Sequence, residues 1–198
     1  MRVRRALCAS LLLLAGCDAP ISYDGPVAGW PVYGGDAGGA RFSPLTQITR
    51  DNVDRLEVAW TFHTGDVLDG STTRGKSAFQ STPVLLGDTL YVCSPKNRVF
   101  ALDPERGTQK WVFDPGIQTE GVWNFTCRGV AAWNDPSARE GQQCASRIFT
   151  GTVDGRLFAL DATTGRPCIA FGDAGGIDLT RGMQPIERGE YGVTSPPT

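Results

Sequence analysis

The chain has 198 residues, 19 Lys and Arg against 21 Asp and Glu, and a formal net charge of −2. Hydrophobic residues make up 40% of it, as in ordinary globular chains, and 25 Gly with 13 Pro indicate many turns. Basic residues form no run after the first five positions, which excludes nucleic acid as the expected partner. The single His and the lack of a Cys-x-x-Cys pair argue against a zinc site.

Residues 1–16 have the pattern of a lipoprotein signal peptide, in which three Arg precede an apolar run. The run is shorter than the roughly 20 residues of a transmembrane helix. It ends in Leu-Ala-Gly-Cys, which resembles the bacterial lipobox, so we expect a lipid on Cys17 that anchors a periplasmic protein to a membrane. The alternative is an ordinary cleaved signal peptide. Cleavage leaves 16 basic and 21 acidic residues, a net charge of about −5.

Residues 17–40 are rich in Gly, Pro and Asp and are predicted to form a tether. From 41 to 198 the pattern is one of short apolar runs between turn signals, without a sustained helical period. Strands are expected at 89–93, 98–102, 110–113, 147–150 and 156–160. The sequence therefore predicts an all-β fold.

An internal repeat shows how these strands are organised. Residues 98–107 read RVFALDPERG and residues 156–165 read RLFALDATTG, 58 positions later. Residues 58–62 echo 109–113, so the chain holds about three blades or partial blades of a β-propeller, each expected as an antiparallel four-stranded sheet. A blade takes roughly 40–50 residues. The longer spacing therefore predicts an insert at 114–146.

Four cysteines follow Cys17, and in an exported chain they are expected to form disulfides with three possible pairings. They are Cys93, Cys127, Cys144 and Cys168. Because Cys127 and Cys144 flank the second half of the insert, we expect a bond between them to restrain it. His63 follows a strand-like run and is expected at the surface.

Five motifs, in order, resemble the quinoprotein dehydrogenases that use pyrroloquinoline quinone (PQQ). They are WPVYGG with RFSPL at 30–45, FQSTP at 79–83, the tryptophan-docking spacing at 101–111, TCRGV at 126–130 and VTSPP at 193–197. The chain is most similar to the N-terminal portion of the membrane-associated glucose, quinate and shikimate dehydrogenases. Two departures are Arg106, where the docking motif usually has Thr, and Ile169, where the later copy lacks Trp.

The resemblance implies an eight-bladed propeller with PQQ and usually Ca²⁺ on its axis. About three blades would lie in this chain, and the Ca²⁺ ligands and catalytic base are expected beyond residue 198. We therefore assign no catalytic residue and no metal ligand, and expect the 198-residue chain to be inactive. The alternative, a natural short open propeller, would expose sheet edges.

The resemblance also implies cofactor-binding residues. Arg128 matches the family's PQQ-binding Arg, whose guanidinium can bind oxygens in a fork, with a surface salt bridge as the alternative. Thr194 matches a Thr that binds a PQQ carboxylate, with an ordinary strand residue as the alternative. Gln80 stands where several members have Glu, and Asn124 where the glucose enzymes have His. Arg41 is expected either at the cofactor rim or in a structural pairing.

The implied function is oxidation of a sugar or cyclic polyol, with electrons passed to a membrane quinone or a cytochrome. Asn124 weakens the case for glucose itself. Trp123 or Phe125 could give the PQQ ring an apolar face, and the absence of paired cysteines at 122–123 disfavours the alcohol-oxidising branch. The alternatives are a lipid-anchored propeller scaffold without cofactor and a sugar-binding protein that has lost its cofactor. A scaffold has no need of Arg128 or of the Thr194 motif.

Overall fold

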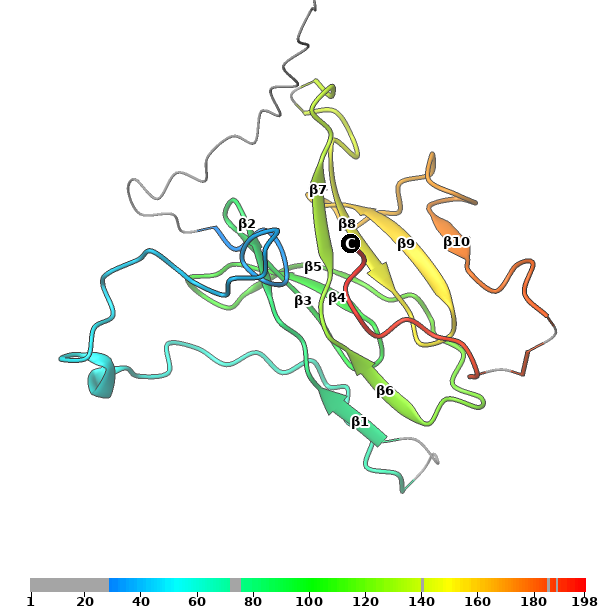
Figure 1. The fold of residues 1–198 in the computed structure, drawn as a ribbon, viewed down its shortest axis with the longest axis horizontal. Helices are drawn as coiled ribbons and strands as arrows, with labels where there is room; N and C mark the ends of the chain where they lie inside the picture. The colour runs from blue at the N-terminus through cyan, green and yellow to red at the C-terminus, as the bar shows by residue number, and fades with distance from the viewer. Residues whose placement is uncertain (1–28, 72–75, 140, 185, 188) are drawn as a thin grey trace, which may run out of the picture.

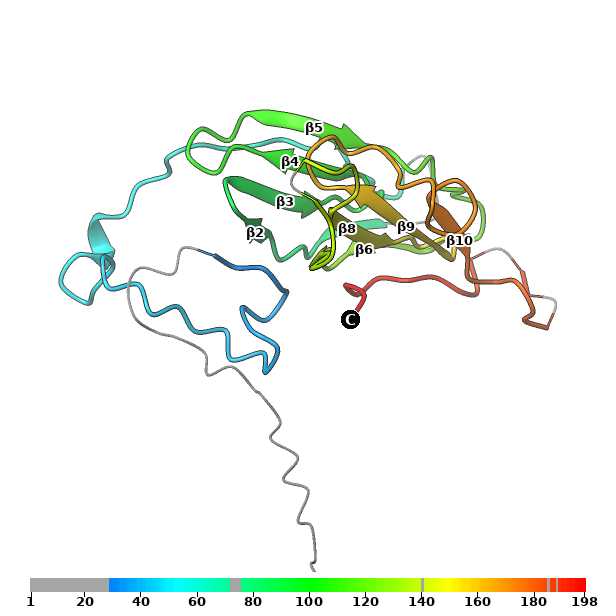
Figure 2. The ribbon, with the colours of Figure 1, turned by 90° about the horizontal axis from the view of Figure 1, so that it is seen from above.

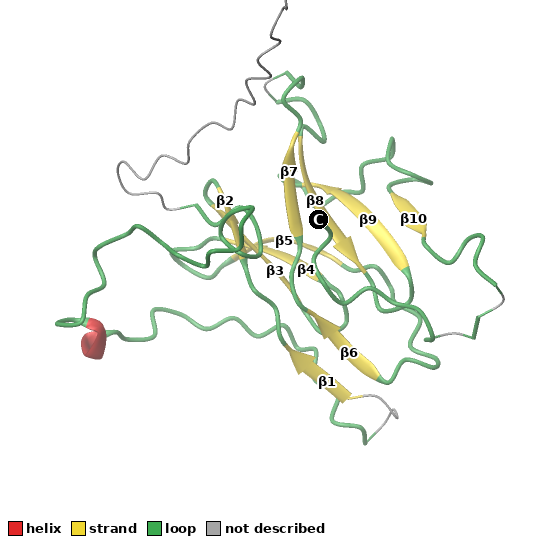
Figure 3. Cartoon of the chain, viewed as in Figure 1, coloured by secondary structure: helices red, strands yellow, loops and turns green. Residues whose placement is uncertain are grey.

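A computed structural model describes residues 29–71, 76–139, 141–184, 186–187 and 189–198. Its strands form two four-stranded antiparallel sheets and one two-stranded parallel ladder (Figures 1 and 3). Within the described residues the only helical element is the short 3-10 helix Val53–Arg55. The predicted all-β propeller architecture is therefore confirmed.

Each four-stranded sheet is one propeller blade, in which every strand pairs with the next along the chain. The first blade comprises β2 (Val84–Leu86), β3 (Thr89–Cys93), β4 (Val99–Leu102) and β5 (Gln109–Phe113). The second comprises β7 (Ala131–Asn134), β8 (Ser146–Gly151), β9 (Arg156–Asp161) and β10 (Gly176–Asp178). The two copies of the repeat thus form β4 and β9 and the turns that follow these strands.

The main apolar core lies between the blades and takes side chains from both. Val84, Val99 and Ala101 of the first blade pack in one cluster with Ile148 and Leu160 of the second, all fully buried. Burial of such side chains is worth roughly 1.5–3 kcal/mol each, so the blades stabilise one another.

A tryptophan contact joins successive blades at the outer strands. Trp111 of β5 lies against Gly165, and its indole N–H donates to a backbone carbonyl of the same turn at 3.0 Å. Trp60 lies against Gly107 in the same way, with an N–H···O distance of 3.1 Å. Residues 58–62 form no strand. Trp60 nevertheless makes the contact that is expected from the similarity of residues 58–62 to residues 109–113.

The turn of the repeat tolerates the departure at Arg106. In the second blade the Asp161 carboxylate accepts hydrogen bonds from the backbone N–H and the hydroxyl of Thr164, both at 2.9 Å. In the first blade the Asp103 carboxylate accepts from the backbone N–H of Arg106 at 2.9 Å and from its guanidinium at 3.1 Å. Arg106 therefore replaces the interaction of the usual Thr.

The insert is shorter than expected. β7 lies inside 114–146, yet it is the first strand of the second blade and pairs with β8 over four residues. Its sequence, Ala-Ala-Trp-Asn, has too little β-branched content to signal a strand. Residues 114–130 alone separate the blades, and they include β6 (Asn124–Cys127).

The expected bond between Cys127 and Cys144 is wrong. The disulfides join Cys93 to Cys127 and Cys144 to Cys168, each with a Cα–Cα distance of 5.9 Å. Cys127 lies before the first residue of β7. Cys144 lies before the first residue of β8, and because β8 runs antiparallel to β7, it is near the last residue of β7. The length of β7 therefore separates these two cysteines.

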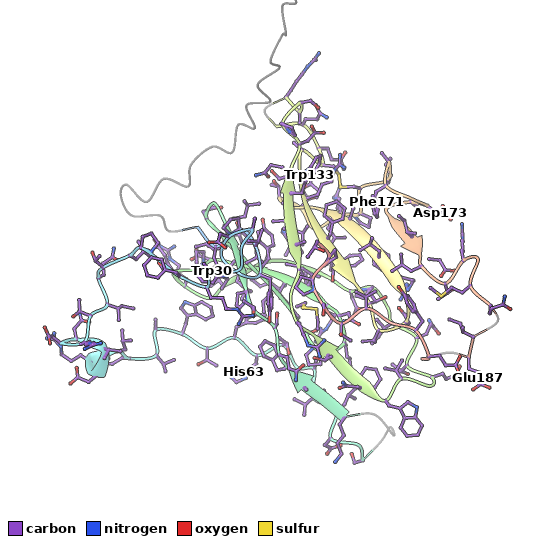
Figure 4. The ribbon with its side chains drawn as sticks, viewed as in Figure 1. Trp30, His63, Trp133, Phe171, Asp173 and Glu187 are labelled. Atoms are coloured by element: carbon purple, nitrogen blue, oxygen red, sulfur yellow. A yellow bond between two sulfur atoms is a disulfide. The ribbon has the colours of Figure 1, made fainter. Side chains whose placement is uncertain are left out.

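Ordered structure extends into the segment predicted as a tether. Trp30 forms an antiparallel bridge with Leu85 of β2, where the N-terminal segment crosses the first blade (Figure 4). His63 is exposed, as expected (Figure 4). Residues 1–16 and Cys17 lie outside the described residues. In the described part, no helix is long and apolar enough to cross a membrane.

Candidate functional site

Three of the motif segments lie side by side along the inner edges of the blades. β1 (Lys76–Phe79) and β6 pair in parallel, in register over four residues. Beyond the ladder, the N–H of Thr82 donates to the carbonyl of Arg128 at 2.9 Å, and the N–H of Arg128 donates to the carbonyl of Thr194 at 2.8 Å. Arg128 is therefore the central residue of three adjacent strand-like segments.

The Arg128 side chain is held by hydroxyl groups of the neighbouring segment. Its Nη1 donates to Thr194 Oγ1 at 2.7 Å and to Ser195 Oγ at 3.5 Å. No ion pair among the described residues includes Arg128. A guanidinium has five N–H donors, and the hydrogen bonds that Arg128 makes to described side chains come from Nη1. The side chain is thus oriented, charged and equipped to bind an anion.

Gln80 belongs to the same assembly through Thr126. The buried Thr126 hydroxyl donates to Gln80 Oε1 at 3.1 Å, and the Thr126 carbonyl accepts from the amide of Asn97 at 3.3 Å. Asn97 is fully buried, and its Oδ1 accepts from the backbone N–H of Val153 in the second blade at 2.9 Å. This network ties the segment that carries Gln80 to both blades.

The N-terminal segment adds Tyr33 and Arg41. The Arg41 guanidinium lies 4.9 Å from the centre of the Tyr33 ring. Hydrogen bonding to Arg41 and to Thr82, together with the charges of Arg41 and Arg128, lowers the pKa of the Tyr33 phenol below its ordinary value of 10.0. Tyr33 therefore lies against Arg41 and is influenced by the charge of Arg128.

Most of the residues expected to bind the cofactor come together. Arg128 contacts Thr194 directly, Gln80 joins through the network, and Arg41 joins through Tyr33. Asn124 does not join them, because it starts β6 and lies four residues before Arg128, about 13 Å along an extended strand.

The two aromatic candidates for a ring contact behave differently. Phe125 is fully buried and packs with Val122 and Val153, so it cannot face a ligand. Trp123 is 63% exposed, but it lies beyond Asn124 from Arg128. Neither position supports the expected apolar face beside Arg128.

Tyr33, Thr82 and Ser195 were missed as site residues. Each lies inside a motif that carried the family resemblance, at positions where the residue type gives no chemical signal by itself. The hydrogen bonds across segments distinguish them, and those depend on the fold. In the described residues, no group of three or more His, Cys, Asp or Glu side chains is placed to hold a metal ion.

Comparison with known proteins agrees with the two blades. The structure of quinohemoprotein alcohol dehydrogenase from Comamonas testosteroni is similar, with a TM-score of 0.66 and 27% sequence identity over 87% of this chain and 22% of that one. The model of the PQQ family, described as the glucose/ethanol/alcohol dehydrogenase β-propeller domain, matches residues 30–198. The chain belongs to this family of PQQ-dependent β-propeller domains.

Two relatives with named substrates have a higher sequence identity to this chain. The quinoprotein glucose dehydrogenase of Escherichia coli is 40% identical over 93% of this chain and 24% of its own length. The quinate/shikimate dehydrogenase (quinone) of Acinetobacter baylyi is 36% identical over 85% of this chain and 22% of its own length. The chain therefore spans less than a quarter of the length of each relative.

Proposed function

We propose that this chain forms the N-terminal part of a PQQ-dependent dehydrogenase that oxidises a sugar or a cyclic polyol. The observation that carries the proposal is the hydrogen bond of 2.7 Å between Arg128 and Thr194, which unites two of the motif segments. Family membership and the glucose and quinate relatives support the substrate class. They also favour a dehydrogenase over the scaffold and the sugar-binding protein.

The residues present fit PQQ, which is a planar tricarboxylate. Arg128 can hold a carboxylate or quinone oxygens with N–H groups of its fork, while Thr194 fixes its orientation. Gln80, whose side chain accepts a hydrogen bond from Thr126, adds a neutral hydrogen-bonding group. When bound, PQQ supplies the quinone that accepts the hydride released as the alcohol carbon becomes a carbonyl. No carboxylate among the described residues pairs with Arg128 and would compete with the ligand.

The other parts of the proposal concern groups outside the described residues. We propose that Ca²⁺ accompanies PQQ with ligands from beyond residue 198, and that electrons pass to a membrane quinone or a cytochrome. The Acinetobacter baylyi relative, a quinate/shikimate dehydrogenase (quinone), supports the quinone. A lipid on Cys17 would hold the protein at a membrane in the periplasm, and multiple acyl chains would make that anchor firm.

Turnover by the full-length protein tests the substrate class. The protein would be reconstituted with PQQ and Ca²⁺, and dye reduction would be followed with glucose, quinate and a primary alcohol as substrates. We expect turnover with a sugar or a cyclic polyol that exceeds turnover with the primary alcohol. Turnover with the primary alcohol alone would contradict the proposed substrate class. Without PQQ, we expect no turnover with any of the three substrates.

A further inference from the structure

We infer that Tyr33 and Arg41 form a second half of the cofactor site, which binds an anionic oxygen of PQQ across from Arg128. The inference rests on the proposed function and adds Tyr33 as a binding residue. It is carried by the path of the N-terminal segment, by the packing of the Tyr33 ring and by the charges around it.

Two backbone contacts fix the N-terminal segment over the first blade. The Trp30–Leu85 bridge has N–H···O distances of 3.1 and 2.9 Å, which tie the segment to β2. A loop then closes when the N–H of Arg41 donates to the carbonyl of Gly34 at 2.8 Å. This loop returns Arg41 to the neighbourhood of Tyr33. Figure 2 shows the N-terminal segment and the C-terminal segment on the same side of the sheets.

The Tyr33 ring packs directly on the segment of Arg128. A Cβ atom at Gly129 would lie 3.5 Å from Cδ2 of Tyr33, 3.2 Å from the carbonyl oxygen of Thr82 and 3.0 Å from Pro196. Gly129 is therefore enclosed by all three neighbouring segments. A Cβ there would be crowded by Pro196 and by the Thr82 carbonyl, whereas its distance to the Tyr33 ring is an ordinary van der Waals contact, so the ring lies directly beside the central strand.

Arg41 is held in an unusual backbone conformation. Its φ of 52° lies in the left-handed region, which residues other than Gly rarely adopt. Such strain persists where the surroundings over-determine it, and it gathers at ligand-binding sites. Here the loop hydrogen bond and the Tyr33 ring supply those surroundings.

The charges favour an anionic ligand with several oxygens. Two guanidinium groups, of Arg41 and Arg128, both act on the Tyr33 phenol. Neither takes part in an ion pair with a carboxylate in the described part of the chain. Two cations in the surroundings of one phenol match a polycarboxylate better than a neutral sugar. These groups would hold PQQ by more than one of its oxygens.

The affinity of the full-length apo protein for PQQ tests this inference. Isothermal titration calorimetry would compare the wild type with Tyr33→Phe, which removes one hydroxyl and keeps the ring on Gly129. Arg41→Gln is a second variant that leaves the Tyr33 ring intact. Tyr191→Phe is the matched control, since Tyr191 contacts Gly155 on the second blade. We expect Tyr33→Phe and Arg41→Gln each to weaken binding roughly tenfold or more, because each removes a hydrogen bond to a charged oxygen.

The outcomes separate this inference from the proposed function. Arg128→Ala, measured in the same series, reports on the proposed site itself. Weakened binding in Arg128→Ala with wild-type affinity in both Tyr33→Phe and Arg41→Gln would overturn the inference alone. Unchanged affinity in all three variants would overturn both. An equal loss in Tyr191→Phe would also count against a specific role for Tyr33.

Discussion

Gly165 and Gly107 show how a single residue can decide whether two blades dock. Both have φ near +70°, and the indole of a Trp from earlier in the chain lies where a Cβ atom would be. At Gly165 that Cβ would come within 2.6 Å of Trp111. The glycine is therefore needed for its conformation and for the space it leaves.

Substitution of Gly165 should separate these two effects. We expect Gly165→Ala to lower the free energy of unfolding by about 3 kcal/mol, since strain and overpacking add. Gly87→Ala is the control, because Gly87 has φ +60° and open space around it. That variant should lose only about 1 kcal/mol. Urea unfolding measures both, and equal losses would show that Trp111 does not require the glycine.

Asp161 gives the protein a predictable response to acid. Burial raises the pKa of its carboxyl, but hydrogen bonds from the backbone of Cys144, the side chain of Thr164 and nearby backbone N–H groups outweigh burial and bring the pKa below 3.8. Because the folded pKa lies below the unfolded one, this stabilisation is complete above about pH 4 and is lost as the pH falls through the folded pKa.

The corresponding measurement is the free energy of unfolding between pH 7 and pH 2. We expect Asp161→Asn to lose about 1–3 kcal/mol at pH 7 and to depend less on pH than the wild type below pH 4. Asp173→Asn, at an exposed position, serves as the control. An Asp161→Asn profile parallel to that of the wild type would argue against the assigned role.

At the scale of elements, a disulfide connects the first blade to the site. Cys93 ends β3 and Cys127 ends β6, directly before Arg128. The other disulfide, between Cys144 and Cys168, lies within the second blade, and neither of its cysteines adjoins Arg128 in the sequence. Both bonds therefore close loops of the chain, but only the Cys93–Cys127 bond is attached to the residue next to Arg128.

Removal of each disulfide should thus have different effects on binding. Replacing Cys93 and Cys127 by Ala opens a link across 34 residues and should cost about 3–4 kcal/mol. We also expect weaker PQQ affinity, because the segment of Arg128 loses its anchor. Replacing Cys144 and Cys168 should cost a similar amount and leave affinity unchanged. If both double variants bind PQQ equally well, the disulfide does not position Arg128.

At the scale of the molecule, the sequence repeat was sufficient to predict antiparallel blades and their docking. It could not locate β7, because four residues of weak β propensity become a strand only beside β8. It also gave the wrong disulfide, Cys127–Cys144, since the pairing depends on which strand ends meet in space. The position of Arg128 was predictable from its motif. The contributions of Tyr33 and Thr82 were not, because they arise from contacts between distant segments.

The affinity of full-length apo protein for PQQ, compared between the wild type and Arg128→Ala, tests the central proposal most directly. Arg166→Ala is the matched control, since Arg166 is an exposed arginine on the second blade. We expect Arg128→Ala to raise Kd by roughly tenfold to a hundredfold, and Arg166→Ala to stay within about twofold of the wild type. A wild-type Kd in Arg128→Ala would contradict the assignment of this site to the cofactor.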